Sequence, residues 1–231
     1  MCETAGNEDT VDFTLISIPV PITHKDYRLN IRRLEASRRL GDSLDVTQAQ
    51  TAARLVRDQL EEILFNGSAI QVQGGSIFGY TTHPDRNTGT GGNWSTTLTD
   101  VYEDVNAMVT AAEADFYFGP YGLYVARSAY GDARGVHDDG SGQSAINRVL
   151  ENLPMVQFFK ASDRLAAENG VLVQMTAEVV DLAIAQQITT VEWSDFGGMV
   201  SRFKVMAAMV PRVKSDANGN SGIVHFTSLQ S

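Results

Sequence analysis

The sequence predicts an α+β fold built around one long helix, with an extended segment before that helix and a group of strands near the end of the chain. Three observations support this class: helical periodicity over residues 45–67, alternating β-branched residues over 11–35, and strand-like runs from residue 171 onward. The 231 residues are 43% hydrophobic and 20% charged, so the chain holds enough apolar surface for one sizeable core or two small ones.

Residues 45–66 are predicted to form one amphipathic helix. Asp45, with Gln48 three residues later, predicts its N-cap, and Asn66–Gly67 predicts a left-handed exit. The apolar residues recur three and four positions apart on one stripe, as Val46, Ala49, Ala53, Val56, Leu60 and Ile63. The charged residues lie mostly off this stripe and are candidates for a lining or for contact with a neighbour: Arg54, Arg57, Asp58, Glu61 and Glu62.

The segment before the helix, residues 11–35, is predicted to form strands because apolar and polar residues roughly alternate there. Pro19 and Pro21 have no N–H to donate to a ladder, so the first part is expected at a sheet edge or in an arm. Unpaired strand edges favour pairing with a partner chain. The expected assembly residues of this arm are Phe13, Leu15, Ile16, Ile18, Pro19 and Pro21.

The middle of the chain is predicted to form an α/β domain of its own. A helix from about Thr99 ends before Gly119–Pro120, and a strand follows over 122–126. A polar, glycine-rich loop over 131–144 then precedes a short helix over 145–152 and a strand over 155–159. Before this domain, residues 67–97 show no sustained period and are predicted to be a long ordered loop.

The last strands are predicted to return to the long helix, because strands after residue 176 need its apolar stripe to complete a core. In the final strand one face is expected to be buried, and it carries Met199, Phe203, Val205, Ala207 and Met209. Arg202 and Lys204 take the other face. The two tryptophans, Trp94 and Trp193, are predicted to be packing anchors.

Composition excludes several classes of protein. The formal net charge of −10 disfavours a basic groove for nucleic acid, because phosphate binding depends on clustered Lys and Arg. Cys2 is the only cysteine, so neither an intrachain disulfide nor a cysteine-based metal cage is expected, and a reducing intracellular origin fits best. The longest aliphatic run, 205–210, is too short to span a bilayer, and the acidic first residues are unlike a signal peptide.

Two polar loops hold the residues that could carry catalysis. The His-Asp-Asp run at 137–139 could supply metal ligands or an acid/base pair, but adjacent side chains point apart and a solvated loop is favoured. His83, Asp85 and Arg86 flank a proline turn, where such residues more often fix the loop than polarise a substrate. No lysine follows a glycine, and no glycine-flanked nucleophile is present. No catalytic, cofactor or metal site is expected, and a loop-based hydrolase remains a remote alternative.

Several segments, in their order, are similar to one known superfamily. Residues 18–25 and then 27–41 (YRLNIRRLEASRRLG) are similar to its strand and turn before a spine helix, and 45–67, ending in EEILFNG, to that helix. Gly119-Pro120-Tyr121 before a strand resembles the start of its axial sheet. Residues 181–193 and 199–226 resemble its late and terminal strands. On these segments the chain resembles the tailed-phage major capsid proteins and encapsulin shell proteins.

The resemblance implies a capsid-type fold. Residues 1–26 would form an extended β-arm over a neighbouring subunit, 27–98 and 177–231 a peripheral β-domain with spine helix 45–66, and 99–176 an axial α/β domain. The glycine-rich axial loop would lie near a symmetry axis, with Arg134, His137, Asp138 and Asp139. Relatives carry an N-terminal arm or helix and a first loop strand that are missing here. The sequence is therefore expected to be a processed or truncated product, or a variant whose loop pairs differently.

The resulting functional prediction is a structural protein rather than an enzyme. It is the major capsid subunit of a tailed phage or prophage, assembled in the bacterial cytoplasm into an icosahedral virion head. Its expected partners are itself, in pentamers and/or hexamers, packaged DNA bound without sequence specificity, and portal or other head proteins; no membrane and no cofactor are expected. The alternative is an encapsulin-type compartment for a cargo enzyme, which the missing N-terminal helix disfavours because that helix helps to dock cargo in encapsulins.

Overall fold

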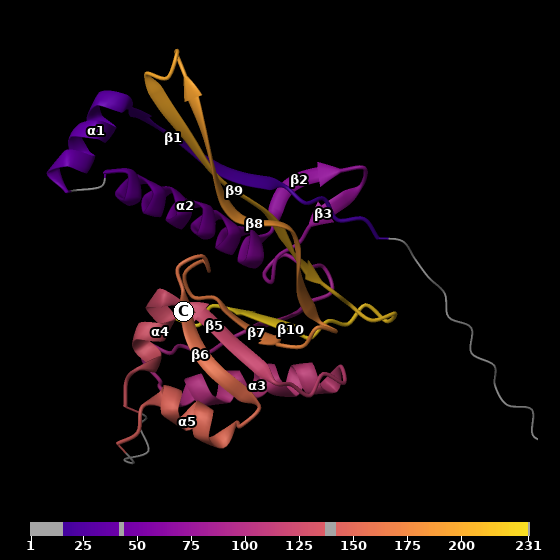
Figure 1. The fold of residues 1–231 in the computed structure, drawn as a ribbon. Helices are drawn as coiled ribbons and strands as arrows, with labels where there is room; N and C mark the ends of the chain where they lie inside the picture. Colours follow the sequence, from indigo (N-terminus) through magenta and orange to yellow (C-terminus); the bar gives the residue numbers. More distant parts are fainter. Residues whose placement is uncertain (1–15, 42–43, 137–141, 231) are drawn as a thin grey trace, which may run out of the picture.

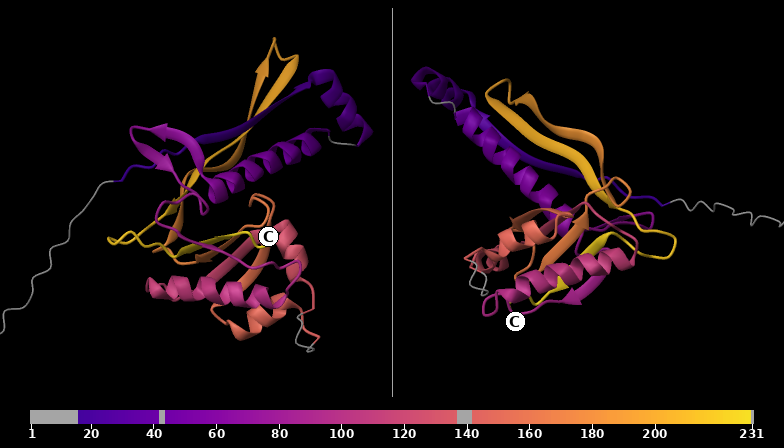
Figure 2. Two further views of the ribbon diagram at one scale, coloured as in Figure 1. Left: turned by 180° about the vertical axis from the view of Figure 1, so that it is seen from behind. Right: turned by 90° about the horizontal axis from the view of Figure 1, so that it is seen from below.

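The computed structural model describes residues 16–41, 44–136 and 142–230, and these fold into two stacked parts (Figure 1). One part is a three-stranded sheet that carries the long helix α2 (Leu44–Asn66) on one face. The other is a five-stranded sheet with three helices of the middle region packed against it. Figure 2 shows from two further sides that the long hairpin of the first sheet stands clear of the second part.

The three-stranded sheet is built from β1 (Ile22–Asn30), β8 (Val180–Asp195) and β9 (Val200–Val213). Its order is β1-β9-β8, and both pairings are antiparallel. Ala52 and Val56 of α2 pack against Val205 of β9. The late strands therefore do return to the long helix, as the sequence predicts.

The predicted inner face of β9 is confirmed from Phe203 to Ala207, whereas Met209, predicted on the same face, is only partly buried. Phe203, Val205 and Ala207 are buried at every second position. Met199, predicted on the same face, is 65% exposed because it lies in the turn before β9. Trp193, predicted to be a packing anchor, is 39% exposed on β8, so that prediction is wrong.

The five-stranded sheet comprises β4 (Asn87–Thr90), β5 (Tyr121–Ala126), β6 (Val156–Ser162), β7 (Gly170–Gln174) and β10 (Ile223–Thr227). Its order is β4-β10-β7-β5-β6. The outer pairs, β4 with β10 and β5 with β6, are parallel, and the inner pairs are antiparallel. Its helices are α3 (Thr99–Ala114), α4 (Arg127–Ala133) and α5 (Ala145–Asn152).

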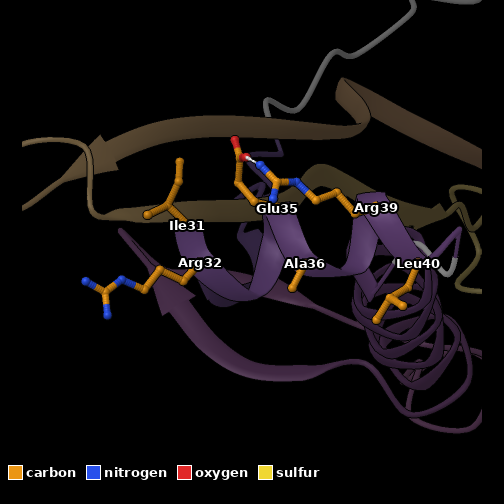
Figure 3. A pocket seen from close by; sticks show the side chains of 6 residues that line it. All are labelled: Ile31, Arg32, Glu35, Ala36, Arg39 and Leu40. Carbon is orange, nitrogen blue, oxygen red and sulfur yellow. Dashed lines mark ion pairs between the residues drawn. The ribbon is translucent and has the colours of Figure 1, made fainter.

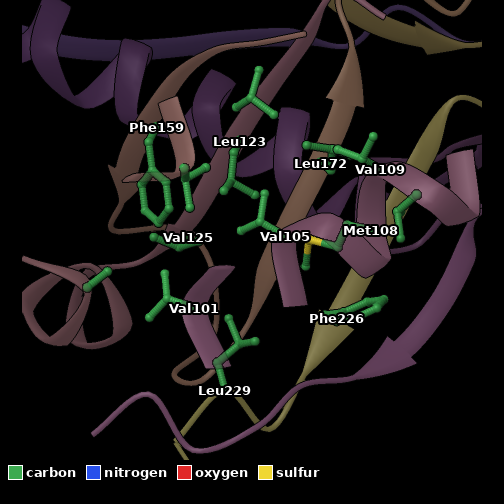
Figure 4. Close-up of a cluster of buried hydrophobic side chains, with 14 of the residues drawn as sticks. Val101, Val105, Met108, Val109, Leu123, Val125, Phe159, Leu172, Phe226 and Leu229 are labelled. Atoms are coloured by element: carbon green, nitrogen blue, oxygen red, sulfur yellow. The ribbon is translucent and has the colours of Figure 1, made fainter. Parts of the chain in front are cut away.

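The main core lies between this sheet and α3 (Figure 4). Val101, Val105 and Met108 recur three or four residues apart on α3 and are fully buried. They face Leu123 and Leu172 of the central strands. The helical spacing after Thr99 thus correctly predicts a buried face, and the middle region has its own core as expected.

The structure corrects the prediction of strand over all of residues 11–35. β1 ends at Asn30, and helix α1 (Ile31–Leu40) follows directly. The side-chain oxygen of Asn30 caps this helix by accepting a hydrogen bond from the backbone N–H of Arg32 at 3.0 Å. Gly41 ends the helix with a φ of 81°. From residue 31 the strand alternation stops, and the apolar residues Ile31 and Leu34 are three positions apart, as on a helix.

Helix α2 agrees with its prediction to within one residue. It begins at Leu44, so Asp45 lies inside the helix rather than before it, and it ends at Asn66. Gly67 follows with a φ of 72°, the left-handed exit that the Asn-Gly pair predicts.

The long loop predicted over 67–97 contains three short strands. β2 (Ser68–Val72) and β3 (Gly75–Ile77) form a hairpin, and β4 pairs in parallel with β10. The sequence-based division placed residues 87–90 and 223–227 in the peripheral domain, whereas these two strands belong to the five-stranded sheet of the middle region. Pairing between segments so far apart leaves no local pattern that would have revealed it.

Replacing Gly67 with alanine is expected to destabilise the protein more than replacing Gly74. Both residues have positive φ, at 72° and 83°. A Cβ on Gly67 would lie 2.5 Å from the Ile77 carbonyl oxygen, whereas nothing lies within 4 Å at Gly74. We expect Gly67→Ala to lower the free energy of unfolding by roughly 2–4 kcal/mol and Gly74→Ala by about 1 kcal/mol, measured in urea. Equal losses would show that the exit of α2 is not closely packed.

Candidate assembly site

The predicted arm is described from Ile16 onward, and Phe13 and Leu15 lie outside the described residues. Residues 16–21 form no strand, so the strand predicted there is wrong, and of the two expected places, a sheet edge or an arm, the arm remains. The Ile16 side chain is 77% exposed. Ile18 packs instead on a small core of α2, β3 and β9 residues, which are Ile63, Ile77 and Val210. The described arm is therefore anchored through Ile18, whereas the apolar side chain of Ile16 is left uncovered.

The acidic residues on the predicted polar face of α2 make their contacts within this chain. Asp58 lies 3.4 Å from the Arg164 guanidinium in an ion pair. Glu61 accepts a hydrogen bond from the Ser162 hydroxyl at 3.2 Å, and Glu62 accepts one from Asn66 at 2.8 Å. The contacts of Asp58 and Glu61 link the helix to the end of β6 and the connection after it, whereas that of Glu62 lies within α2. The basic residues Arg54 and Arg57 are exposed and stay candidates for contact with a neighbour.

The predicted axial loop is only partly described. Arg134 is exposed directly after α4, and Val136 is 56% exposed. Val136 forms an isolated antiparallel bridge with Ser144, which closes the base of the loop. His137, Asp138 and Asp139 lie outside the described residues, so their expected position near a symmetry axis stays a prediction.

The second polar loop is fixed by a cluster of two histidines and one arginine. His83 and His225 are both buried. The Arg86 guanidinium donates to the His83 backbone carbonyl at 2.7 Å and to Nδ1 of His225 at 3.3 Å. The Ser221 hydroxyl donates to the carbonyl of Asp85 at 3.0 Å. The prediction that Arg86 fixes the loop is confirmed, and Asp85 takes part through its backbone, whereas no local sequence signal pointed to the distant partner His225 on β10.

Both histidines of this cluster have lowered pKa values. Burial, and then the neighbouring Arg86 guanidinium, lower the pKa of His225 to about 4. Burial also lowers the pKa of His83, although Asp85 acts in the opposite direction. Both rings are therefore neutral at pH 7. Nε2 of His225 is buried and has no hydrogen-bond partner in the described structure.

This cluster joins parts of the fold and does not form a catalytic arrangement. Its bonds run between the loop backbone, one guanidinium and a strand residue, whereas a hydrolase pairs a nucleophile with a base. Over residues 16–41, 44–136 and 142–230, no three His, Cys, Asp or Glu side chains form a group that could hold a metal ion. In the same described ranges no helix is long and apolar enough to cross a membrane.

The glycine-rich loop before Trp94 is likewise held in place by contacts within the chain. Nε1 of Trp94 and the backbone N–H of Gly92 donate to the same oxygen of Asp104, at 2.6 and 2.8 Å. Trp94 is fully buried, which confirms its prediction as a packing anchor. Burial raises the pKa of Asp104, while these two hydrogen bonds oppose the rise. The loop is thus tied to α3 and has the role of a packed connection.

An exposed apolar surface that the sequence reasoning missed lies on the β8–β9 hairpin. Phe196 and Met199 at its turn are 69% and 65% exposed. Along β8 the exposed apolar side chains are Leu182, Ile184, Val191 and Trp193. The Gly197–Gly198 pair was the available signal for a tight turn between two long strands. Apolar side chains gathered on a protruding hairpin are typical of an interaction surface.

A long helix on a three-stranded sheet, with a separate mixed sheet beside it, defines the capsid-type fold of tailed-phage capsid and encapsulin shell proteins. The virus-like particle of Pyrococcus furiosus matches with a TM-score of 0.71 and 19% identity, covering 90% of this chain and 77% of that chain. The capsid of Myoviridae phage XM1 matches with a TM-score of 0.74 and 13% identity, covering 92% and 74%. The predicted fold class is confirmed.

The chain belongs to the family described as a family of unknown function (DUF6260), whose pattern matches residues 3–226. It is also 29% identical over 196 residues to the type 1 encapsulin shell protein EncA of Myxococcus xanthus (strain DK1622). That match covers 84% of this chain and 65% of the relative, so the chain spans less than two thirds of the relative's length. These relatives are shell, particle and capsid proteins and not enzymes, in agreement with the predicted class.

Lowering the pH is expected to destabilise the protein through His225. Its folded-state pKa, about 4, lies below the unfolded value of 6.5, so the unfolded state binds the proton more readily. The stability contributed by the neutral ring is complete above pH 6.5 and is lost as the pH falls toward 4. We expect a loss on the order of 2 kcal/mol between these values, measured by urea unfolding.

The matched control is His225→Gln, which can still accept from Arg86 but does not titrate. Its free energy of unfolding should fall less steeply over the same pH range. If the wild-type protein and His225→Gln have the same pH dependence, the histidine is not protonated upon unfolding in this range.

Proposed function

We propose that this chain is the subunit of a closed protein shell and assembles with copies of itself. The observation that carries the proposal is the apolar surface that one chain leaves uncovered on the β8–β9 hairpin, in a chain with a capsid-type fold. Burial of these side chains between copies would remove them from water. Each interface can be modest, because a subunit in a shell is held by several neighbours at once.

The arm, the basic residues of α2 and the axial loop each have a place in this proposal. The arm, residues 1–26, lies over a neighbouring subunit. Contact with that subunit covers the exposed apolar side chains of the arm, including Ile16. The exposed basic residues of α2 meet a neighbour or the interior, and the axial loop after Arg134 lies near the axis of a pentamer or hexamer. The domain division proposed from the sequence is kept, with β4 and β10 joined to the axial part.

Two kinds of shell content are supported by different observations. The net charge of −10 favours a phage or prophage capsid, because an acidic subunit does not bind packed DNA tightly. Such a capsid would assemble in the bacterial cytoplasm with portal or other head proteins and become part of the virion. The identity to an encapsulin shell protein favours a compartment around a cargo enzyme. Nuclease-resistant DNA in purified particles would support the capsid, and a co-purifying protein inside them would support the compartment.

A charge at Ile16 is expected to block assembly without unfolding the subunit. Because the side chain is 77% exposed, Ile16→Asp should change the free energy of unfolding by less than about 0.5 kcal/mol. The loss of one apolar contact per interface should lower the particle yield at least about tenfold. Electron microscopy and size-exclusion chromatography with light scattering measure that yield.

Asn106→Asp, at an exposed position on α3, is the matched control for added charge. Folded wild-type protein that remains a monomer or dimer at all concentrations would overturn the shell proposal. Full yields of Ile16→Asp particles would instead exclude this arm residue from the interface.

A further inference from the structure

Helix α1 carries a basic surface in an otherwise acidic chain. Residues 28–39 contain five arginines and one carboxylate, although the net charge of the chain is −10. Arg39 pairs with that carboxylate, Glu35, at 3.9 Å. Among the carboxylates that the structure describes, none forms an ion pair with Arg32 or Arg33. Two guanidinium groups at this end of the molecule are therefore available to a ligand.

The position of these arginines is unfavourable for the helix itself. Asn30 is the N-cap, so Arg32 and Arg33 lie in the first turn, which contains no acidic residue. The partial positive charge of a helix N-terminus favours anions there and disfavours cations. Residues that oppose helix stability and have no described partner within the chain indicate an interaction with something outside it.

The basic surface is also partly apolar. Ile31 and Leu40, 37% and 84% exposed, lie at the two ends of α1. With Ala36 between them they line a shallow groove of about 530 Å³. Figure 3 shows Arg32 extended away from the ion pair of Glu35 and Arg39. A ligand that fits this groove offers carboxylates and apolar side chains together.

Residues 3–16 of the chain have this combination. They contain four acidic residues and no basic one, and their later part alternates apolar with polar residues. The acidic residues are Glu3, Glu8, Asp9 and Asp12, and the apolar ones include Val11, Phe13, Leu15 and Ile16. Charge and apolar pattern are therefore both complementary to the groove on α1.

The geometry favours a second copy as the source of this segment. β1 separates residue 16 from α1, and its nine residues span about 30 Å. Figure 1 shows α1 at one end of β1 and the described segment before β1 at the other. A segment of this length reaches about 45 Å when fully extended, so folding back to its own α1 would use almost its whole length. A neighbouring copy can place its own α1 beside the segment without that constraint.

We propose that the basic surface of α1 binds residues 3–16 of a second copy. This inference rests on the proposed shell function and names the surface that receives the arm. Carboxylates of one subunit meet Arg32 in this groove of the next and Arg33, which lines an adjoining groove, and the apolar residues of the segment cover Ile31 and Leu40. The interaction repeats around the shell because every subunit carries both partners.

Cysteine cross-linking between two differently tagged proteins tests the pairing. The donor protein carries Cys2→Ser with Thr10→Cys, and the acceptor protein carries Cys2→Ser with Ala36→Cys. After co-assembly and treatment with a short bismaleimide, we expect a cross-linked species that contains both tags. Cys2→Ser with Ser128→Cys, exposed on α4, is the control acceptor and should give at least about tenfold less product.

Charge reversal separates recognition from folding. Arg32→Glu with Arg33→Glu in the acceptor protein places acids in the first turn of α1, so the subunit should keep or increase its melting temperature. The cross-link between positions 10 and 36 should nevertheless fall at least about tenfold, and Glu8→Lys with Asp9→Lys in the donor protein should restore it. A charge-reversed acceptor that cross-links as well as the original would overturn the inference.

The shell proposal and this inference fail in different ways. Particles that form without any cross-link between residues 10 and 36 overturn the inference and leave the shell proposal in place. Absence of particles from folded wild-type protein overturns the shell proposal. If the charge-reversed particles lose bound nucleic acid and no cross-link forms in the original pair, α1 binds nucleic acid and the inference is overturned.

Discussion

The rest of the structure depends on the burial of α2 from two sides by segments that come much later in the chain. The middle of the helix, at Ala52 and Val56, packs under β9. Its end, at Phe65, belongs to a second apolar cluster with Tyr80 and with Ile223 of β10. One helix shared by two cores holds the two sheets in a fixed relation. In the first sheet, as described, β1 and β8 are the edge strands.

Polar contacts reinforce this arrangement at the places where the two parts meet. The ion pair of Asp58 with Arg164 joins α2 to the connection after β6. Arg86 joins the loop after α2 to His225 of β10. Breaking the contact of Arg86 would leave the buried ring of His225 without its partner, whereas the partly exposed ion pair contributes less. The residues that most resembled a catalytic loop are thus needed for the fold, and this agrees with a structural function.

The surfaces that remain uncovered have different chemistry at different places. The β8–β9 hairpin and Ile16 expose apolar side chains, whose burial would provide affinity without much selectivity. Helix α1 exposes arginines, whose pairing with an acidic segment would select one partner and one orientation. A subunit that combines both kinds of surface can form strong interfaces and still assemble in a defined geometry.

The sequence by itself determined the elements with strong local signals: α2 with its Asn-Gly exit, α3 with its buried stripe, the inner face of β9, and Trp94 as an anchor. In each case the spacing of apolar residues is a local consequence of helix or strand geometry. Only the tertiary structure decided that β4 and β10 join the central sheet, that His225 partners Arg86, and that α1 is a helix with a basic surface. Those features arise from contacts between distant segments or from a single capping residue, and the local pattern contains little trace of either.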